Sequence, residues 1–133
     1  MAPIYLSAPA YLLKKLNTII INAAKSTVGS YNPRISHKKL LSTCGWTDIN
    51  ILIQNEALKF LHKLLFLKKP KVLYNLFNIP NRNAKNVSIK NYRKSKLTDN
   101  IFLFKILPLY NSLPSQAKQL KPKGFSKYLK RNL

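Results

Sequence analysis

The sequence predicts an all-α fold, a small helical bundle with a basic loop and a basic C-terminal tail. Apolar residues recur every three or four positions in several segments, and capping residues, glycines or prolines bound these segments. At 133 residues, 46% of them hydrophobic, the chain can form one core of modest size. The expected organisation is one helical domain over 1–133, with an irregular lead-in over 1–8, a helical core over 9–77, a basic loop over 78–97 and a helical closing segment with the tail over 98–133.

The strongest helical pattern runs through residues 46–69 and predicts a helix that organises the rest of the chain. Thr47 is the expected N-cap, and Asp48 places negative charge on the first turn, where the helix dipole favours it. Pro70 ends the helix, because proline cannot continue it. His62 lies between two lysines and is expected to face solvent or to help bind phosphate. The predicted inward face consists of Ile49, Leu52, Ile53, Ala57, Phe60, Leu61, Leu64 and Leu65.

Two further helices are predicted before this one. The first covers about residues 9–28 and ends before Gly29, and the second covers 36–44 with a serine cap. Trp46 stands at the junction of two apolar helices and is expected to be largely buried against the first. The inward residues expected on the two helices are Leu13, Leu16, Ile20, Ala23 and Thr27 on the first and Leu40 and Leu41 on the second.

The chain beyond Pro70 is predicted to form shorter elements around an exposed basic loop. Prolines, asparagines and short apolar runs alternate there, so no long helix is expected. The expected elements are a short helix over 72–77, an extended piece over 87–89, a helix capped by Thr98, a turn between Pro108 and Pro114, a helical piece over 115–120 and an amphipathic end after Gly124 with Phe125, Tyr128 and Leu129 on one side.

The charge balance carries the main functional signal. The chain has 24 Lys and Arg residues against three Asp and Glu residues, which gives a net charge of +21. Internal salt bridges cannot neutralise such an excess, so the chain needs a polyanionic partner. DNA, RNA or an RNA–DNA duplex is the expected partner, an anionic membrane surface is a weaker candidate, and no small-molecule substrate is expected.

Basic residues on the central helix, at its end and in the loop are the expected phosphate contacts. Each side chain alone would be an ordinary solvated charge, but almost no acidic residues are interspersed among them. Contacts to phosphate position a protein on nucleic acid without reading its sequence. The predicted nucleic-acid-binding residues are Lys59, Lys63, Lys68, Lys69, Lys71, Arg82, Lys85, Arg93 and Lys94.

The sequence does not provide the groups that metal-dependent catalysis needs. Polymerases and nucleases usually bring several carboxylates together on metal ions, whereas the acids here are Asp48, Glu56 and Asp99. The two aspartates are expected in the first turns of helices, and Glu56 is expected to pair with Lys59 on the surface. We therefore expect no catalytic residues, no metal site and no cofactor.

Two features bear on the compartment. The N-terminal region has no basic start before an apolar core, so a signal peptide is not expected. The single cysteine, Cys44, rules out an internal disulfide and is compatible with a reducing compartment. A nuclear or cytoplasmic location is therefore expected rather than a secreted one.

Several short motifs follow one another in a fixed order along residues 10–131. They are LLKKLNTIIINAAK, LLSTCGW, FLHKLLF, KPKVLYNLF, a basic loop, LYNSLP and GFSKYLK. This order resembles the C-terminal end of reverse transcriptases from non-LTR (LINE-like) retrotransposons, the region downstream of the catalytic palm. The residues that carry the resemblance most strongly are Gly45-Trp46, His62-Lys63, Pro70 and Tyr110-Asn111-Ser112-Leu113-Pro114.

The resemblance implies a helical thumb and post-palm segment that grips the template–primer duplex. The palm of that family, an RNA-directed DNA polymerase, carries paired aspartates for two metal ions, and this chain has no such pair. The resemblance therefore implies a non-catalytic nucleic-acid-binding fragment, which holds the phosphate backbone without reading the sequence.

Two other functions fit the same composition. One is a small basic RNA-binding protein of a ribonucleoprotein, similar to an organellar ribosomal protein, in which residues 78–97 and the tail would be disordered without RNA. The other is a helical interaction module for an acidic protein or an anionic lipid. Binding to liposomes in competition with a duplex separates the second of these from nucleic-acid binding.

Overall fold

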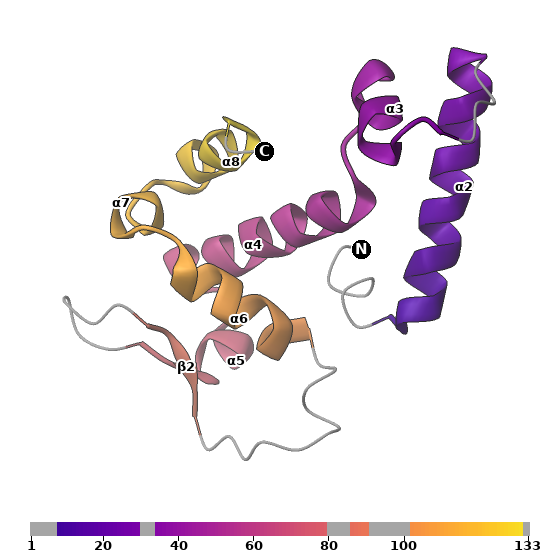
Figure 1. The fold of residues 1–133 in the computed structure, drawn as a ribbon. Helices are drawn as coiled ribbons and strands as arrows, with labels where there is room; N and C mark the ends of the chain where they lie inside the picture. Colours follow the sequence, from indigo (N-terminus) through magenta and orange to yellow (C-terminus); the bar gives the residue numbers. More distant parts are fainter. Residues whose placement is uncertain (1–7, 30–33, 80–85, 91–101, 132–133) are drawn as a thin grey trace.

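The computed structural model describes residues 8–29, 34–79, 86–90 and 102–131. Within these residues the chain forms seven helices and one small two-stranded sheet, so the all-α fold predicted from the sequence is confirmed (Figure 1). The elements are α2 (Ala10–Val28), α3 (His37–Thr43), α4 (Ile49–Leu67), α5 (Lys71–Tyr74), β1 (Phe77–Asn78), β2 (Ser88–Ile89), α6 (Phe102–Ser112), α7 (Ser115–Lys118) and α8 (Pro122–Arg131).

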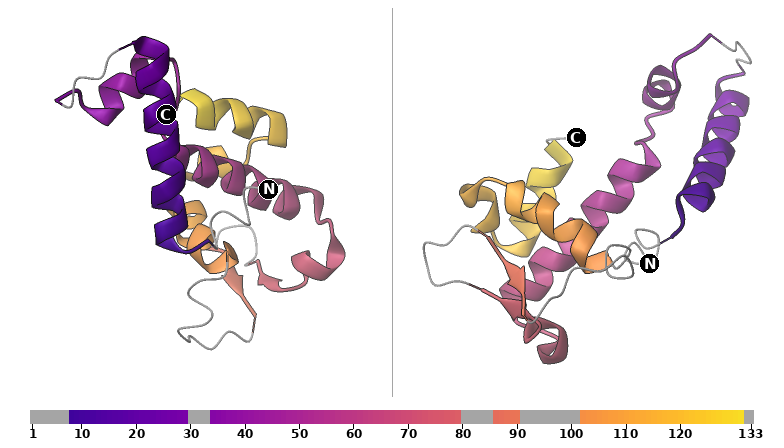
Figure 2. Two further views of the ribbon diagram at one scale, coloured as in Figure 1. Left: turned by 90° about the vertical axis from the view of Figure 1, so that its right-hand side faces the viewer. Right: turned by 60° about the horizontal axis from the view of Figure 1, so that its bottom comes forward.

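Buried apolar side chains of the described residues form two clusters. The smaller cluster joins α2 to α3 through Ile21, Ala24, Leu40 and Leu41. The larger cluster surrounds α4, which packs against α6 and α8 on different sides (Figure 1). The α2–α3 pair lies at the N-terminal end of α4, and α5 and the sheet lie near its other end (Figure 2). The central helix is therefore covered by the C-terminal third of the chain.

The sequence located α4 correctly but not its cap or all of its buried face. The N-cap is Asp48, whose Oδ1 accepts a hydrogen bond from the backbone N–H of Asn50 at 2.8 Å, so the prediction of Thr47 was wrong. Leu52 and Phe60 were expected inside but are exposed. Packing on two sides widens the buried sector of the helix. The buried residues are Ile53, Ala57, Leu58, Leu61, His62 and Leu64.

The first two helices lie where the sequence placed them, although their contacts differ. On α2 the buried residues are Ile21 and Ala24, one position along from the predicted Ile20 and Ala23, and Ile20 is half-buried. The prediction that Trp46 is buried was wrong, because 41% of its surface is exposed. Leu40 and Leu41 of α3 already cover α2 and leave the indole ring at the α3–α4 junction.

The turn that ends α3 has the geometry of a Schellman motif. Gly45 adopts the left-handed conformation with φ of 68°, which glycine enters without steric cost. Its N–H donates to the carbonyl of Ser42 at 3.0 Å, and the N–H of Trp46 donates to the carbonyl of Leu41 at 2.8 Å. The predicted end of this helix at Gly45 is confirmed, and the turn directs the chain into α4.

The chain after Pro70 departs from the sequence-based expectation in two places. The short helix α5 ends at Tyr74, and Phe77 enters β1 instead, where it pairs with Ile89 of β2. The expected turn after Pro108 was also wrong, because α6 continues through this proline to Ser112. Its apolar face packs on α4, and this packing outweighs the weak helical preference of proline. The extended piece expected near residues 87–89 is confirmed by β2.

Among the helices of the described residues, none is both long enough and apolar enough to span a membrane.

Lys68 ends α4 in the left-handed conformation, with φ of 55°, and it provides a stability prediction. A side chain in this conformation costs roughly 1–2 kcal/mol, whereas glycine adopts it without a clash but loses more chain entropy on folding. We therefore expect Lys68→Gly to raise the free energy of unfolding by about 0.5–1 kcal/mol. Urea unfolding measures this change. The matched control is Lys69→Gly, which removes the same charge at the next position, where the backbone is not left-handed.

A Lys68→Gly variant that is less stable than the wild-type protein would contradict this description of the α4 terminus. The control is expected to be neutral or destabilising, since Lys69 lies outside the left-handed region.

Candidate nucleic-acid interface

A basic hollow lies between α4 and the start of α8. It has a volume of about 580 Å³ and is lined by Lys59, Lys63, Leu67, Lys121, Pro122, Lys123 and Ser126. The two lysines of α4 are four residues apart, so they stand on the same face of the helix one turn from each other. The two lysines near α8 flank its first residue, Pro122. Two segments about sixty residues apart in the sequence thus present four ammonium groups to one opening.

The apolar face of α8 holds it in this position. Phe125 is completely buried and Leu129, one turn later, is nearly so. Both belong to the large cluster around α4. Lysines occupy the opposite face of α8, where Lys123, Lys127 and Lys130 are exposed. Burial of one face therefore fixes the direction in which the basic face of the helix points.

His62 connects α4 to α6 and α8. Its ring stacks on the Phe125 ring with 3.9 Å between centroids and 15° between planes. Nε2 lies 2.8 Å from the backbone oxygen of Leu120, and Nδ1 lies 3.1 Å from the hydroxyl of Tyr110. Because a carbonyl oxygen only accepts, Nε2 carries the proton and donates, and Nδ1 accepts from the tyrosine hydroxyl. The neutral imidazole is thus satisfied on both nitrogens.

Burial sets the protonation of this pair. Desolvation lowers the pKa of His62 below its ordinary value, and the hydrogen bond to the Leu120 carbonyl opposes part of that shift. Burial also raises the pKa of Tyr110 to about 12, which keeps its hydroxyl protonated as a donor. His62 is 1% exposed, so the expectation that it faces solvent or phosphate was wrong. Its neighbours on α4, Leu58 and Leu61, are buried too and indicate the side on which it lies.

Asn111 performs a second structural role in the same region. Its side-chain oxygen accepts the N–H of Val87 at 2.9 Å, and its side-chain nitrogen donates to the Val87 carbonyl at 3.0 Å. The amide therefore acts as a short strand partner that holds the β2 segment against α6. Lys118 donates to the Asn111 carbonyl at 2.7 Å. His62, Tyr110 and Asn111 thus hold the core together.

The electrostatics of the basic hollow are positive with little compensation. Lys59 pairs with Glu56 on the same helix, as the sequence predicted. Within the part of the chain that the structure describes, no carboxylate pairs with Lys63, Lys121 or Lys123. The partial positive charge at the N-terminus of α8 adds to the charges of these lysines. The opening between α4 and α8 is therefore suited to anionic groups.

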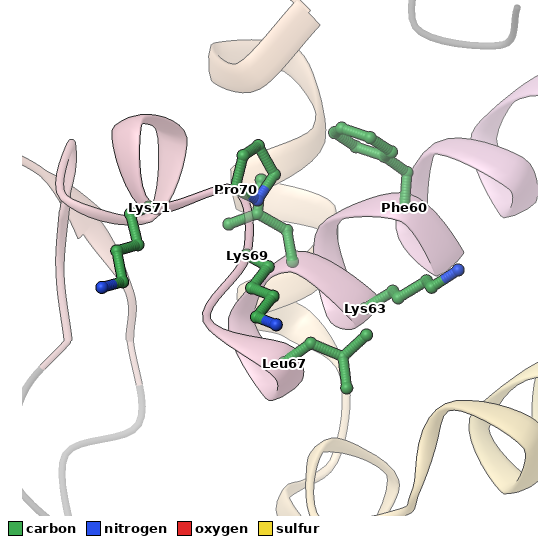
Figure 3. A pocket seen from close by; sticks show the side chains of 7 residues that line it. Phe60, Lys63, Leu67, Lys69, Pro70 and Lys71 are labelled. Atoms are coloured by element: carbon green, nitrogen blue, oxygen red, sulfur yellow. The ribbon is translucent and has the colours of Figure 1, made fainter.

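A second hollow adjoins the first along α4. It has a volume of about 610 Å³ and is lined by Phe60, Lys63, Leu64, Leu67, Lys69, Pro70 and Lys71 (Figure 3). Lys63 and Leu67 line both hollows, so the two form one continuous surface. We call this surface, from Lys71 through Lys63 to Lys123, the lysine surface.

The structure brings together only part of the predicted binding set. Lys59, Lys63, Lys69 and Lys71 all line the lysine surface. Lys68 lines neither hollow and instead ends α4. Lys121 and Lys123 are not among the binding residues predicted from the sequence, because their nearness to α4 depends on the packing of Phe125 and cannot be read from local spacing. The predictions for Arg82, Lys85, Arg93 and Lys94 lie outside the described residues.

In the described ranges, no group of three or more histidine, cysteine, aspartate or glutamate residues comes together in a way that could hold a metal ion. Comparisons of the chain with models of known protein families, with curated proteins and with solved structures found no match.

Proposed function

We propose that this protein is a non-catalytic nucleic-acid-binding protein that grips the phosphate backbone without reading the base sequence. The observation that carries the proposal is the gathering of Lys59 and Lys63 with Lys121 and Lys123 around one hollow between α4 and α8. Lys59 pairs with Glu56, but Lys63, Lys121 and Lys123 have no carboxylate partner among the described residues, and such a cluster of ammonium groups attracts the closely spaced charges of a nucleic-acid backbone. The overall net charge of +21 acts in the same direction at longer range.

The residue types favour backbone contact over base readout. The lysine surface contains lysines but no arginine, asparagine or glutamine among its lining residues. Lysine is a flexible point charge, whereas base edges are usually read by the planar, bidentate groups of Arg, Asn and Gln. Affinity is therefore expected to depend on phosphate and salt much more than on sequence.

The resemblance to the C-terminal region of non-LTR retrotransposon reverse transcriptases supports the same proposal. In that interpretation the helices correspond to the thumb and post-palm part, which holds a template–primer duplex. The gripping surface would be the α4–α8 side, and the motif residues His62, Tyr110 and Asn111 would maintain its geometry. The expected ligands are DNA, RNA or an RNA–DNA duplex.

The proposal predicts a steep salt dependence of binding to duplexes of unrelated sequence. Six lysines line the two hollows, and about 0.9 counterions are released per neutralised phosphate, so the slope of log K against log salt approaches about −5. Affinity should then fall about a thousandfold between 50 and 200 mM salt. Fluorescence anisotropy with two unrelated DNA duplexes and one RNA–DNA hybrid measures the slope.

All three ligands are expected to bind within a few-fold of one another at each salt concentration. A flat salt dependence, or a strong preference for one of the two DNA sequences, would refute phosphate gripping. Liposomes of anionic lipid, added as competitors, test membrane binding, and displacement of the duplex by lipid at equal charge would also contradict the proposal.

A further inference from the structure

The hollow at the C-terminal end of α4 differs in chemistry from its neighbour. Its lining combines the apolar side chains of Phe60, Leu64, Leu67 and Pro70 with three lysines. In Figure 3 the Phe60 ring and Pro70 lie on one side of the space and Leu67 lies on the other, with Lys63 and Lys69 between them. A site for phosphate alone needs no apolar walls. The combination of apolar side chains and lysines therefore suits a ligand that has a flat, uncharged part beside its negative charges.

The ring of Phe60 is only partly covered by other side chains of the protein. The side chain is 38% exposed, and it contacts Phe102 in an edge-to-face arrangement with 5.7 Å between centroids. Leu67, across the hollow, is 47% exposed. Large apolar groups that remain exposed together, with cations around them, are typical of a binding surface. Aromatic rings in a basic groove stack on nucleic-acid bases in many proteins that bind single strands.

The apolar hollow adjoins the basic hollow, so a ligand with a base in the first can have its phosphates in the second. Lys63 and Leu67 line both hollows, so a chain whose base enters the apolar hollow would place its next phosphates near Lys59, Lys121 and Lys123. No aspartate or glutamate lines either hollow. The alternation of base and phosphate along a single strand matches this alternation of apolar and basic lining.

We infer that the hollow formed by Phe60, Leu64, Leu67 and Pro70 binds an unpaired base, and that the lysine surface therefore prefers single-stranded nucleic acid, or a single-stranded end beside a duplex, to a continuous duplex. This inference rests on the proposed function and names the form of its ligand. In a duplex the base faces are stacked and unable to meet Phe60, whereas in a single strand each base can leave the stack.

The test separates bases from phosphates in the ligand. A fluorescein-labelled thymidine oligomer of about twelve nucleotides is compared with an abasic oligomer that has the same number of phosphates. The wild-type protein is expected to bind the thymidine oligomer at least about fivefold more tightly, since stacking of one base on an aromatic ring contributes a factor of roughly 5 to 150. Phe60→Leu, which keeps an apolar contact to Phe102, is expected to abolish the preference and to leave the salt slope unchanged.

Trp46→Leu is the matched control. It removes another exposed aromatic ring, in a hollow of about 460 Å³ that is lined also by Asp48 and lies away from the lysine surface. The control is expected to keep the base preference. Loss of the preference in Trp46→Leu but not in Phe60→Leu would move the base site away from α4 and overturn the inference.

A second variant keeps the test decisive if Phe60→Leu disturbs the fold. Phe60→Trp in a Trp46→Phe background places the protein's only tryptophan at the hollow, because the natural chain has a single tryptophan. The thymidine oligomer should quench its fluorescence, and the abasic oligomer should not. Equal and tight binding of both oligomers by the wild-type protein would overturn the base site alone, while failure of every oligomer and duplex to bind would overturn the proposed function as well.

Discussion

Replacing His62 by alanine is expected to lower the free energy of unfolding by about 3–5 kcal/mol. The imidazole is buried and stacks on Phe125, so its removal leaves a cavity between α4 and α8. It also leaves the Tyr110 hydroxyl and the Leu120 carbonyl without their partner. A domain of this size has only about 5–15 kcal/mol of stability in total, so a large part of it depends on this one side chain. Urea unfolding followed by circular dichroism measures the loss.

Matched variants separate the cavity from the hydrogen bonds. His62→Phe fills the space with a somewhat larger aromatic ring and keeps the stack but removes both polar contacts, and Tyr110→Phe removes only the hydroxyl that donates to Nδ1. Both should cost less than His62→Ala, and about 1–3 kcal/mol each. His37→Ala, on the exposed surface of α3, should change the stability by less than about 0.5 kcal/mol. If His62→Ala proved as mild as His37→Ala, the ring could not be part of the core.

The two long helices, α2 and α4, could be predicted from the sequence because their signals are local. The extent of α2 follows from its apolar spacing and from Gly29, and α4 stops near Pro70 as expected. What surrounds each helix could not be predicted in the same way. His62 carries a polar ring between two lysines, and only the arrival of Tyr110 and Phe125 from the distant C-terminal segment makes its burial favourable.

The candidate site could be predicted from the sequence for the residues of α4 but not for Lys121 and Lys123, which flank the first residue of α8. Lys59 and Lys63 stand one turn apart on a helix, and that spacing can be counted in the sequence. Lys121 and Lys123 join them because Phe125 packs α8 onto α4, a contact between segments about sixty residues apart. The prediction for Trp46 failed in the opposite direction, because a burial was expected that the structure does not contain. Its size and position suggested burial, yet Leu40 and Leu41 already cover α2.

The second large effect is expected from the four lysines around the α4–α8 hollow. Changing Lys59, Lys63, Lys121 and Lys123 together to glutamine should lower duplex affinity by up to about four thousandfold at 100 mM salt, because each lost phosphate contact costs roughly eightfold there. The fold is expected to persist. Lys63, Lys121 and Lys123 are exposed, and the pair of Lys59 with Glu56 lies on the surface, where an ion pair contributes little.

A matched variant tests whether the loss of duplex affinity comes only from the lower net charge. Glutamine at Lys14, Lys15, Lys38 and Lys39 removes four charges from α2 and α3, so both variants carry a net charge of +17, from 21 minus 4. Long-range attraction falls equally in the two proteins. Only the first variant loses direct phosphate contacts in our account. The control is therefore expected to keep most of the wild-type affinity.

The most direct measurement is the salt slope of duplex binding for the wild-type protein, the α4–α8 variant and the α2–α3 variant, determined by anisotropy on one duplex between 50 and 200 mM salt. Four phosphate contacts at about 0.9 each correspond to a change of about 3.6, so the α4–α8 variant should lose up to that amount of slope while the α2–α3 variant stays near the wild-type value. Equal slopes for the two variants would contradict the account, since binding would then follow the total charge rather than the surface between α4 and α8.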